Sequence, residues 1–312
     1  MIVIIILMVI FSVTGYLNFS PPGEVGSMPL YNFLFQNLQN SRWGSVVISS
    51  LIIGIILVAL TRLNISNFLL EDRSFMPAAL YLFILGSFPS ASVLNPVLVV
   101  TVFILLAFLG LLKGEEHRAN PIALFNAGIL IAIGSLFYLK IIWYIPFFWI
   151  AVAMIRPLKW RGIINPFLAF IVLGLFYIGY YWIFKDDLHS LPGILRTNLS
   201  GNGTIKTFSV DQWIMISYIF LLTFIASFYL MTRFTAKKNI IRKIYQVLFV
   251  LFLYTLAFYF FISGRGLQLI SVLAIPLSML LSNYFHRRKT QWFHELLLLV
   301  WLGLIIFVQL RY

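Results

Sequence analysis

Residues 237–266 read KKNIIRKIYQVLFVLFLYTLAFYFFISGRG, and this stretch decides the fold. It opens with a cluster of four cations: Lys237, Lys238, Arg242 and Lys243. Residues 244–262 follow without a charged side chain, and a membrane-spanning helix needs about 20 mostly apolar residues. The break Ser263-Gly264-Arg265-Gly266 then ends the run, because glycine interrupts regular structure. We therefore predict a transmembrane helix with a basic end and a short turn after it.

Runs of this kind fill the rest of the chain. Of its 312 residues, 62% are hydrophobic and 10% are charged, whereas a soluble domain is about half apolar and a quarter charged. We predict about eleven spans, at roughly 2–17, 45–63, 76–92, 95–112, 122–139, 141–156, 164–184, 212–232, 244–262, 267–284 and 294–310. The predicted fold class is an all-α polytopic transmembrane helical bundle, with residues 1–312 forming a single integral membrane domain.

Lysine and arginine are concentrated in every second gap between these spans. One set of gaps, from Arg62 to Lys289, holds fifteen of the 22 cations, and the other set holds seven. Bacterial inner membranes keep the richer set on the cytoplasmic side. We therefore predict a multi-pass protein of the bacterial inner (cytoplasmic) membrane, with the N-terminus inside and the C-terminus outside. The net charge of +13 then reports orientation, and we expect no nucleic-acid partner.

Two of the predicted outward loops are longer than turns, at about 18–44 and 185–211. In the first loop, apolar residues between Leu30 and Leu38 recur at helical spacing, which predicts an amphipathic helix lying in the membrane interface. The first span is short for a bilayer whose hydrocarbon core is about 30 Å thick, so we expect that the given start lacks a few residues.

Proline and glycine make finer predictions about the helices. Pro166 should lie near a helix start, where its missing N–H costs nothing, whereas Pro146 and Pro276 fall inside spans and should kink them. Small residues let transmembrane helices approach closely. Helix packing is therefore the predicted role of four glycines: Gly128, Gly134, Gly174 and Gly179.

Three motifs follow one another between Asn120 and Arg161. They are Phe125-Asn126-Ala127-Gly128, Ser135-Leu136-Phe137-Tyr138 and Ile155-Arg156-Pro157-Leu158-Lys159-Trp160-Arg161. These motifs resemble an uncharacterised polytopic membrane family of the Bacteroidota, over most of the chain and most weakly after about residue 190. Members usually begin with a short basic, proline-containing segment, which this chain lacks. The resemblance implies no activity.

The predicted architecture also looks like that of the GT-C glycosyltransferases, which have many spans, an N-terminus inside and an interfacial helix in the first outward loop. This likeness implies the use of a polyprenyl-phosphate sugar at the outer face of the membrane. Those enzymes carry an aspartate in the first outward loop, whereas Glu24 is the only acid in the corresponding loop here. The chain therefore departs from the pattern at the catalytic position.

Acidic side chains in the outward loops are the candidates for catalysis. Glu24 or Asp186 could take a proton from an acceptor hydroxyl. Asp186 and Asp187 could also hold a divalent cation that bridges a lipid diphosphate. The alternative for all three is an ordinary solvated loop charge.

Arg265 is the candidate for binding a phosphate or lipid headgroup. It lies between Gly264 and Gly266, so the backbone is accessible and the guanidinium offers a bidentate fork. Arg196 and Lys206 could join it from the neighbouring loop. The alternative is an arginine that reaches the headgroups of bulk phospholipid.

The histidines do not form a metal-binding pattern. The predicted topology sends His189 outward and the other three, His117, His286 and His294, toward the cytoplasmic ends. We therefore predict no metal site among them. The spans also contain almost no charged residues, which disfavours proton-driven transport.

Three functional hypotheses remain open. The leading one is envelope biogenesis through a polyprenyl- or phospholipid-linked substrate at the outer leaflet. The second is a non-catalytic subunit of an envelope or secretion complex, and the third is a transporter or flippase. Membrane lipids are expected partners in all three, together with other envelope membrane proteins in the second.

Overall fold

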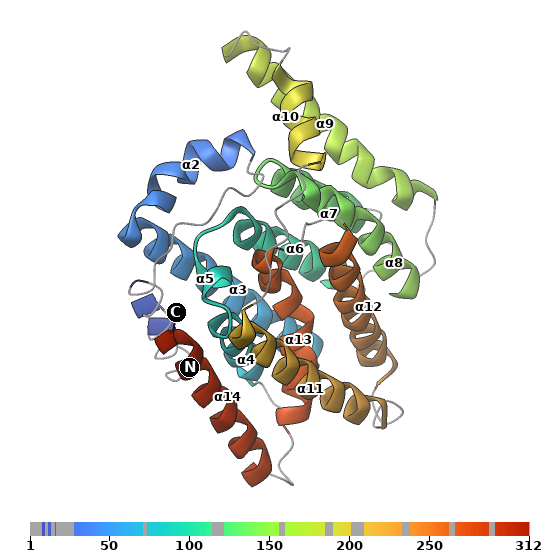
Figure 1. Ribbon diagram of the computed structural model, residues 1–312. Helices are drawn as coiled ribbons and strands as arrows, with labels where there is room; N and C mark the ends of the chain where they lie inside the picture. The colour runs from blue at the N-terminus through green and yellow to red at the C-terminus, as the bar shows by residue number, and fades with distance from the viewer. Residues whose placement is uncertain are drawn as a thin grey trace.

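The computed structural model describes residues 8–9, 12–13, 16, 28–70, 74–113, 122–155, 160–184, 190–200, 209–232, 238–261, 266–286 and 291–311. Within these ranges the regular structure is helical throughout, without a strand. Figure 1 shows one bundle of helices, from which α9 (Trp160–Phe184) and α10 (Ser190–Ser200) project. The predicted all-α class is confirmed for this part of the chain.

The remaining helices follow in chain order. They are α2 (Pro29–Asn40), α3 (Arg42–Asn67), α4 (Met76–Gly86), α5 (Pro89–Ser92), α6 (Pro96–Lys113), α7 (Ile122–Ser135), η1 (Leu139–Tyr144, a 3₁₀ helix), α8 (Ile145–Ile155), α11 (Val210–Thr232), α12 (Asn239–Phe261), η3 (Leu267–Leu269, also 3₁₀), α13 (Ile270–Phe285) and α14 (Gln291–Arg311).

Six helical stretches of the described chain are long and apolar enough to cross a membrane: Arg42–Asn67, Gly162–Gly179, Val210–Thr232, Asn239–Phe261, Leu267–Phe285 and Trp292–Gln309. Four further apolar stretches are shorter: Met76–Gly86, Pro96–Leu112, Ala123–Ser135 and Leu139–Ile155. The 11 residues of α4 extend only ~16 Å at ~1.5 Å per residue, against a core of about 30 Å. A helical membrane protein is confirmed, while the count of eleven spans stays a prediction.

Proline explains one difference between the predicted and the observed helices. The predicted span 76–92 is divided into α4 and α5, and Phe88 between them is extended, with φ −133° and ψ 85°. Pro89 follows directly, and a residue before proline is disfavoured in the helical conformation by a steric clash. The segment therefore turns at this point instead of continuing as one helix.

Two other proline predictions were wrong, and in opposite directions. Pro146 is the second residue of α8, where a helix tolerates proline, because the first turn needs no N–H donor. Pro166 lies inside α9, which already begins at Trp160. Only Pro276 is interior as predicted, in α13.

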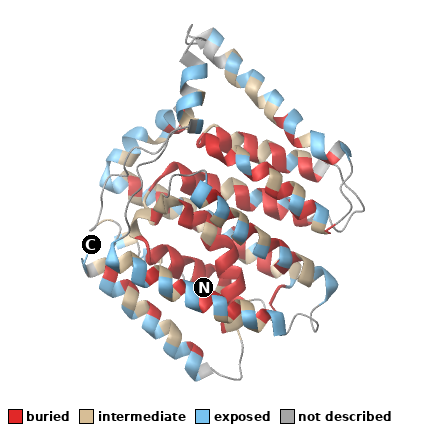
Figure 2. Ribbon diagram, turned by 45° about the vertical axis from the view of Figure 1, so that its right-hand side comes forward, coloured by how far each residue is buried: buried red, intermediate tan, exposed pale blue. Residues whose placement is uncertain are grey.

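Helix α13 is the centre of the bundle. It packs against α4, α6, α11 and α12, and 72% of its apolar stretch is buried. The corresponding share in α9 is 17%, because α9 packs mainly on α7. Figure 2 shows the same contrast, with buried residues concentrated in the central helices and exposed ones along α9 and α10.

The glycine predictions divide into one correct pair and one wrong pair. A Cβ added at Gly128 would lie 2.6 Å from Pro166 Cα, and one at Gly134 would lie 2.9 Å from Ile141 Cδ1. No described atom lies within 4 Å of the corresponding position at Gly174 or Gly179. Close helix packing therefore depends on the two glycines of α7, and the two in α9 have no such role here.

Three contacts among the described residues bring the ends of different helices together. At one end, the Met28 N–H donates to the Phe137 carbonyl and α10 contacts η1. At the opposite end, the Lys243 ammonium donates to the Ile155 carbonyl over 2.8 Å. Met28 and Phe137 adjoin gaps of the sparser set of cations, and Lys243 and Ile155 adjoin gaps of the richer set. The alternation over all the connections stays a prediction. Which end faces the cytoplasm stays a prediction.

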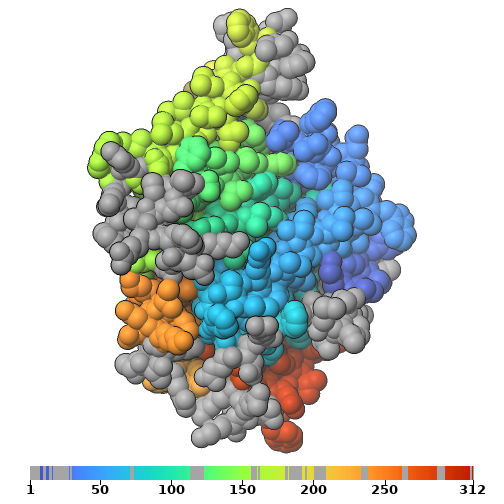
Figure 3. Space-filling model, turned by 180° about the vertical axis from the view of Figure 1, so that it is seen from behind, coloured from blue at the N-terminus to red at the C-terminus, as the bar shows by residue number. Residues whose placement is uncertain are grey.

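The predicted loop at about 18–44 contains a helix, as its sequence predicts. Helix α2 covers Pro29–Asn40; it buries Tyr31 against the bundle, while the apolar side chains of Phe33 and Leu34 are exposed. It packs on α3. Figure 3 shows α2 and α3 together on one outer face of the molecule, with α9 and α10 extending beyond it.

Candidate functional site

A cavity of about 540 Å³ lies between α11 and α12, with α13 as its floor. Both outer helices pack against α13, and Figure 1 shows them beside it. The cavity is lined by Ile84, Phe88, Trp213, Ile216, Ile219, Phe220, Thr223, Phe252, Thr255, Leu256, Tyr259, Phe260, Leu267, Leu269, Ile270, Leu273 and Leu277. Its volume is within the range of about 300–1,000 Å³ that is usual for small-molecule sites.

Helix α11 presents one face to this cavity and another to α14. Residues lining the cavity recur every three or four positions, from Trp213 to Thr223, which places them on one side of a helix. On the other side, the Tyr218 hydroxyl donates to the Leu297 carbonyl over 2.8 Å. The helix is therefore held from behind by α14 while its front forms a wall of the cavity.

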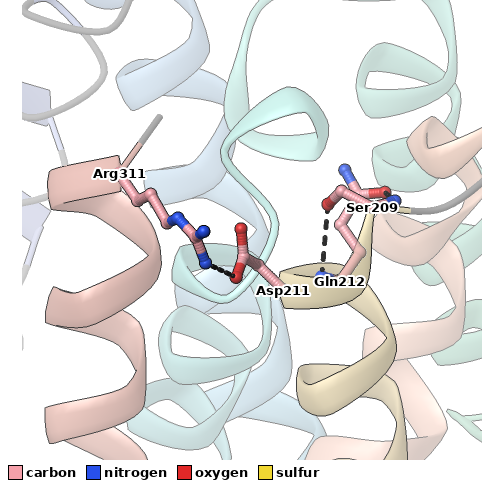
Figure 4. A network of polar contacts seen from close by, with 4 residues as sticks. All are labelled: Ser209, Asp211, Gln212 and Arg311. Carbon is pink, nitrogen blue, oxygen red and sulfur yellow. Dashed lines mark hydrogen bonds and ion pairs between the residues drawn. The ribbon is translucent and has the colours of Figure 1, made fainter.

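The first turn of α11 is fixed by a small polar network (Figure 4). Ser209 Oγ accepts from the Gln212 N–H, and Gln212 Oε1 accepts from the Ser209 N–H. This reciprocal arrangement is a capping box. Beside it, Arg311 at the end of α14 pairs with Asp211 over 2.8 Å. Asp211 carries its negative charge at the positive end of the helix dipole, where it is stabilising.

Helix α12 forms the second wall and is fixed by η1. The Tyr144 hydroxyl donates to Thr255 Oγ1 over 3.3 Å, and the Tyr254 hydroxyl donates to the Trp143 carbonyl. The Thr223 hydroxyl across the cavity donates to the Ile219 carbonyl of its own helix. Both threonine hydroxyls in the lining are thus already hydrogen-bonded within the protein.

Hydrogen bonds to Ser271 fix the start of the floor helix. The Tyr81 hydroxyl of α4 donates to the Ser271 carbonyl over 3.1 Å. Thr101 Oγ1 of α6 lies 3.0 Å from Ser271 Oγ, and the Ser271 hydroxyl also reaches the Gln268 carbonyl. These contacts hold the junction of η3 and α13, where Leu269 and Ile270 line the cavity.

The lining decides what the cavity can accept. Among the described residues that form it, no side chain is acidic or basic, and six are aromatic. An ionised group placed there would lose its hydration without gaining a partner, at a large cost in free energy. The cavity therefore suits a hydrocarbon chain, and any charged headgroup must stay outside it.

Most of the predicted site residues lie outside the described residues. This holds for Glu24, Asp186, Asp187, Lys206 and Arg265. The structure therefore neither brings them together nor separates them.

Two placements bear on the predicted phosphate site. Arg196 is exposed on α10. Phe260 and Leu267, which precede and follow the segment 262–265 along the chain, both line the cavity. The connection that carries Arg265 therefore joins two cavity residues.

Two ionisable residues have roles that the sequence did not reveal. Lys140 of η1, one of the seven cations in the sparser set of gaps, is only 6% exposed, and this burial lowers the pKa of its ammonium group. No sequence pattern assigned a role to Asp211. The Ser209-x-x-Gln212 spacing before an apolar run could have marked the start of α11, but nothing local indicates the pairing of Asp211 with Arg311.

The histidines that are described do not form a metal cluster. The His294 ring packs against Tyr284 and Phe285, with ring centroids 4.7 and 5.7 Å apart. No group of three or more histidine, aspartate or glutamate side chains suited to a metal ion occurs within the described ranges.

Comparison with known proteins gives one match. The model of a family described as "Family of unknown function (DUF6427)" matches residues 1–312, the whole length given. The chain belongs to this family. No curated protein and no solved structure matches the chain. DUF6427 membership therefore fixes the family without naming a reaction, and the functional argument depends on the cavity.

Proposed function

We propose that this DUF6427 protein acts in envelope biogenesis in the bacterial inner membrane, where it binds a polyprenyl- or phospholipid-linked substrate at the outer leaflet. The observation that carries the proposal is the cavity of about 540 Å³ between α11 and α12. Its mostly aromatic and aliphatic lining suits the hydrocarbon part of such a substrate, and both threonines of the wall are hydrogen-bonded within the protein.

We place the headgroup at the connection that follows α12 along the chain. Arg265 is in the connection between two cavity-lining residues, and a guanidinium binds phosphate oxygens through two parallel hydrogen bonds. Burying the chain while leaving the phosphate at the rim avoids the cost of placing an anion in an apolar site. Arg196 and Lys206 would add positive charge on the same side.

The catalytic form of the proposal follows GT-C chemistry. The acceptor hydroxyl oxygen attacks the anomeric carbon, the new glycosidic bond forms, and the polyprenyl phosphate leaves with the bonding electron pair. Glu24 or Asp186 would take the proton of the acceptor hydroxyl. A divalent cation held by Asp186 and Asp187 would stabilise the departing phosphate.

Lipid retention tests the proposal directly. The full chain is purified in mild detergent, and the bound lipids are extracted and identified by mass spectrometry. Ile216→Trp fills the cavity from α11, whereas Leu221→Trp adds the same side chain at an exposed position of that helix. We expect a phosphate-bearing lipid with the wild type and with Leu221→Trp, and its loss with Ile216→Trp. Equal retention by both variants would exclude the cavity as the binding site.

Variants that each remove one charged group then test the phosphate site and the catalytic residues separately. Arg265→Gln should reduce retention of the phosphate-bearing lipid, and unchanged retention would remove Arg265 from the site. Glu24→Gln and Asp186→Asn should retain the lipid but stop its turnover, measured as the loss of phosphate-linked lipid on incubation with membranes. If both variants keep the wild-type function in cells, the catalytic form is wrong.

A second function is favoured by the exposure of α9. Ile171, Leu175 and Phe176 are each more than half exposed on this projecting helix, which provides a long apolar face for another membrane protein. A non-catalytic subunit of an envelope or secretion complex would use this face. Stable, stoichiometric co-purification of a protein partner, together with function in the Glu24→Gln and Asp186→Asn variants, would favour this alternative.

A further inference from the structure

A second, much smaller cavity lies between the first helical segment and α3. Its volume is about 30 Å³. Hydroxyl groups are its distinctive feature, because five of the residues that line it are serines: Ser12, Ser45, Ser49, Ser50 and Ser92. This cavity is separate from the site between α11 and α12 and has no residue in common with it.

The described residues of the first segment lie along α3 in an antiparallel register. Ser12 Oγ and Ser50 Oγ are 2.8 Å apart, and the Tyr16 and Trp43 rings have centroids 4.7 Å apart. As the residue number rises in the first segment, that of its neighbour falls in α3. The serine-lined cavity lies at the polar contact of this helix pair.

Four of the five hydroxyls have hydrogen-bond partners within the protein. Ser49 donates to the Val46 carbonyl over 3.1 Å and Ser92 to the Pro89 carbonyl over 2.8 Å. Ser12 lies 2.7 Å from the Met8 carbonyl, Ser50 lies 2.7 Å from the Val46 carbonyl, and the two hydroxyls lie 2.8 Å from each other, so one of them donates its proton to the other. A hydroxyl has one proton and two lone pairs. These oxygens therefore remain acceptors toward the cavity.

Ser45 differs from the other four. Its side chain is 0% exposed, it lines the cavity, and its Oγ has no hydrogen-bond partner among the described residues. Buried hydroxyls are normally hydrogen-bonded, because a hydroxyl loses its hydrogen bonds to water on burial. Without a partner in the protein, this loss is not compensated. The cavity thus contains one hydroxyl that lacks a partner among the described residues, beside serine oxygens that have lone pairs to accept a hydrogen bond.

A water molecule matches these groups in size and in hydrogen bonding. A cavity needs at least about 10–15 Å³ to hold one water, and the water needs two to four polar partners. It can accept the Ser45 proton and donate its own two protons to neighbouring serine oxygens. A monovalent cation would also find lone pairs here, but no described acid lines the cavity, and neutral hydroxyls do not offset the loss of a cation's hydration.

We propose that this cavity binds one ordered water molecule, which joins the first helix to α3 through Ser45 and the neighbouring serine hydroxyls. In lipid, the surfaces of transmembrane helices are similarly apolar, so a polar contact between two helices fixes which positions of the helices meet. The water fixes the register of the first helix on the bundle by completing the hydrogen bonds of this contact.

The direction in which Ser45→Ala shifts the midpoint of thermal unfolding tests the proposal. In the full chain in lipid nanodiscs, Ser45→Ala should lower the midpoint of thermal unfolding by about 2–4 °C, because the water loses a partner. Ser66→Ala, at an exposed serine of the same helix, should leave it unchanged. If the cavity is dry, Ser45→Ala removes an unpaired buried hydroxyl, and the midpoint should stay the same or rise, which would overturn the proposal.

Two further measurements identify the occupant. A structure that resolves ordered waters should show density within hydrogen-bonding distance of Ser45 Oγ, and an empty cavity would refute the assignment. The unfolding midpoint should be equal in sodium, potassium and choline chloride at one ionic strength. A rise with sodium or potassium alone would show a bound cation instead of water.

Discussion

Gly128 lies at a close approach between α7 and α9. A Cβ at this position would lie 2.6 Å from Pro166 Cα and 3.3 Å from Ala169 Cβ. Carbon atoms in good contact are about 3.5–4.0 Å apart, so Gly128→Ala requires α9 to move by about 1 Å. The nearest atom belongs to the backbone, and a change of side-chain rotamer cannot relieve the clash.

The expected loss of stability in Gly128→Ala combines a cost from overpacking with a gain in helix propensity. Overpacking of this kind costs about 1–3 kcal/mol, while replacing glycine by alanine inside a helix gains about 1 kcal/mol. The displaced helix also loses part of its dispersion contacts with α7. We therefore expect Gly128→Ala to destabilise the protein by about 1–2 kcal/mol, which corresponds to a fall in the unfolding midpoint of about 2–8 °C.

Gly174→Ala is the matched control. It makes the same change in the neighbouring helix, where no described atom lies within 4 Å of the added carbon. Only the gain in helix propensity remains, so its midpoint should equal or exceed that of the wild type.

The chain has no cysteine and contains eight tryptophans, so unfolding in detergent can be followed by intrinsic fluorescence at one scan rate. A Gly128→Ala midpoint at or above that of Gly174→Ala would refute the packing argument.

Three other outcomes follow from single contacts. Asp211→Asn should destabilise by less than about 1 kcal/mol, and the effect should disappear in high salt or when Arg311 is already replaced by Gln, as a thermal double-mutant cycle would show. Tyr81→Phe should cost about 1 kcal/mol in the free energy of unfolding by removing the hydrogen bond to the Ser271 carbonyl; an unchanged midpoint would contradict that bond. Burial lowers the pKa of Lys140 in the folded protein. At a pH between this lowered pKa and the ordinary lysine pKa, the unfolded chain binds more protons than the folded protein, so the free energy of unfolding should rise with pH there. Lys140→Met should remove this slope in midpoints measured across alkaline pH, and a slope that persists would assign it to another group.

Local features of the chain predicted the helices well. Each of the ten apolar stretches in the described chain coincides with a predicted span, because hydropathy over about 20 residues reflects the cost of placing backbone and side chains in lipid. The boundaries were less accurate where a proline intervened. Pro89 begins a new helix, whereas Pro166 lies inside one, although each follows an apolar or polar residue that gives no local sign of the difference.

The candidate site was only partly accessible to prediction. The sequence drew attention to Arg265 through its flanking glycines, but no periodicity distinguished Phe220, which lines the cavity, from Phe224, which does not. Both are apolar residues of one helix in lipid. Likewise, Gly128 and Gly174 have equally apolar neighbours along the chain. Only the tertiary structure, in which α9 packs against α7 at Gly128, distinguishes the packing of the two glycines.

The sequence by itself determined that this is a helical membrane protein and where its helices lie. These properties depend on short-range composition and on charges at helix ends. Only the tertiary structure decided the cavity between α11 and α12, the serine-lined cavity on α3 and the close approach at Gly128. The physical reason is that lipid and protein interior are both apolar, so hydropathy cannot tell a helix face that meets lipid from one that meets another helix.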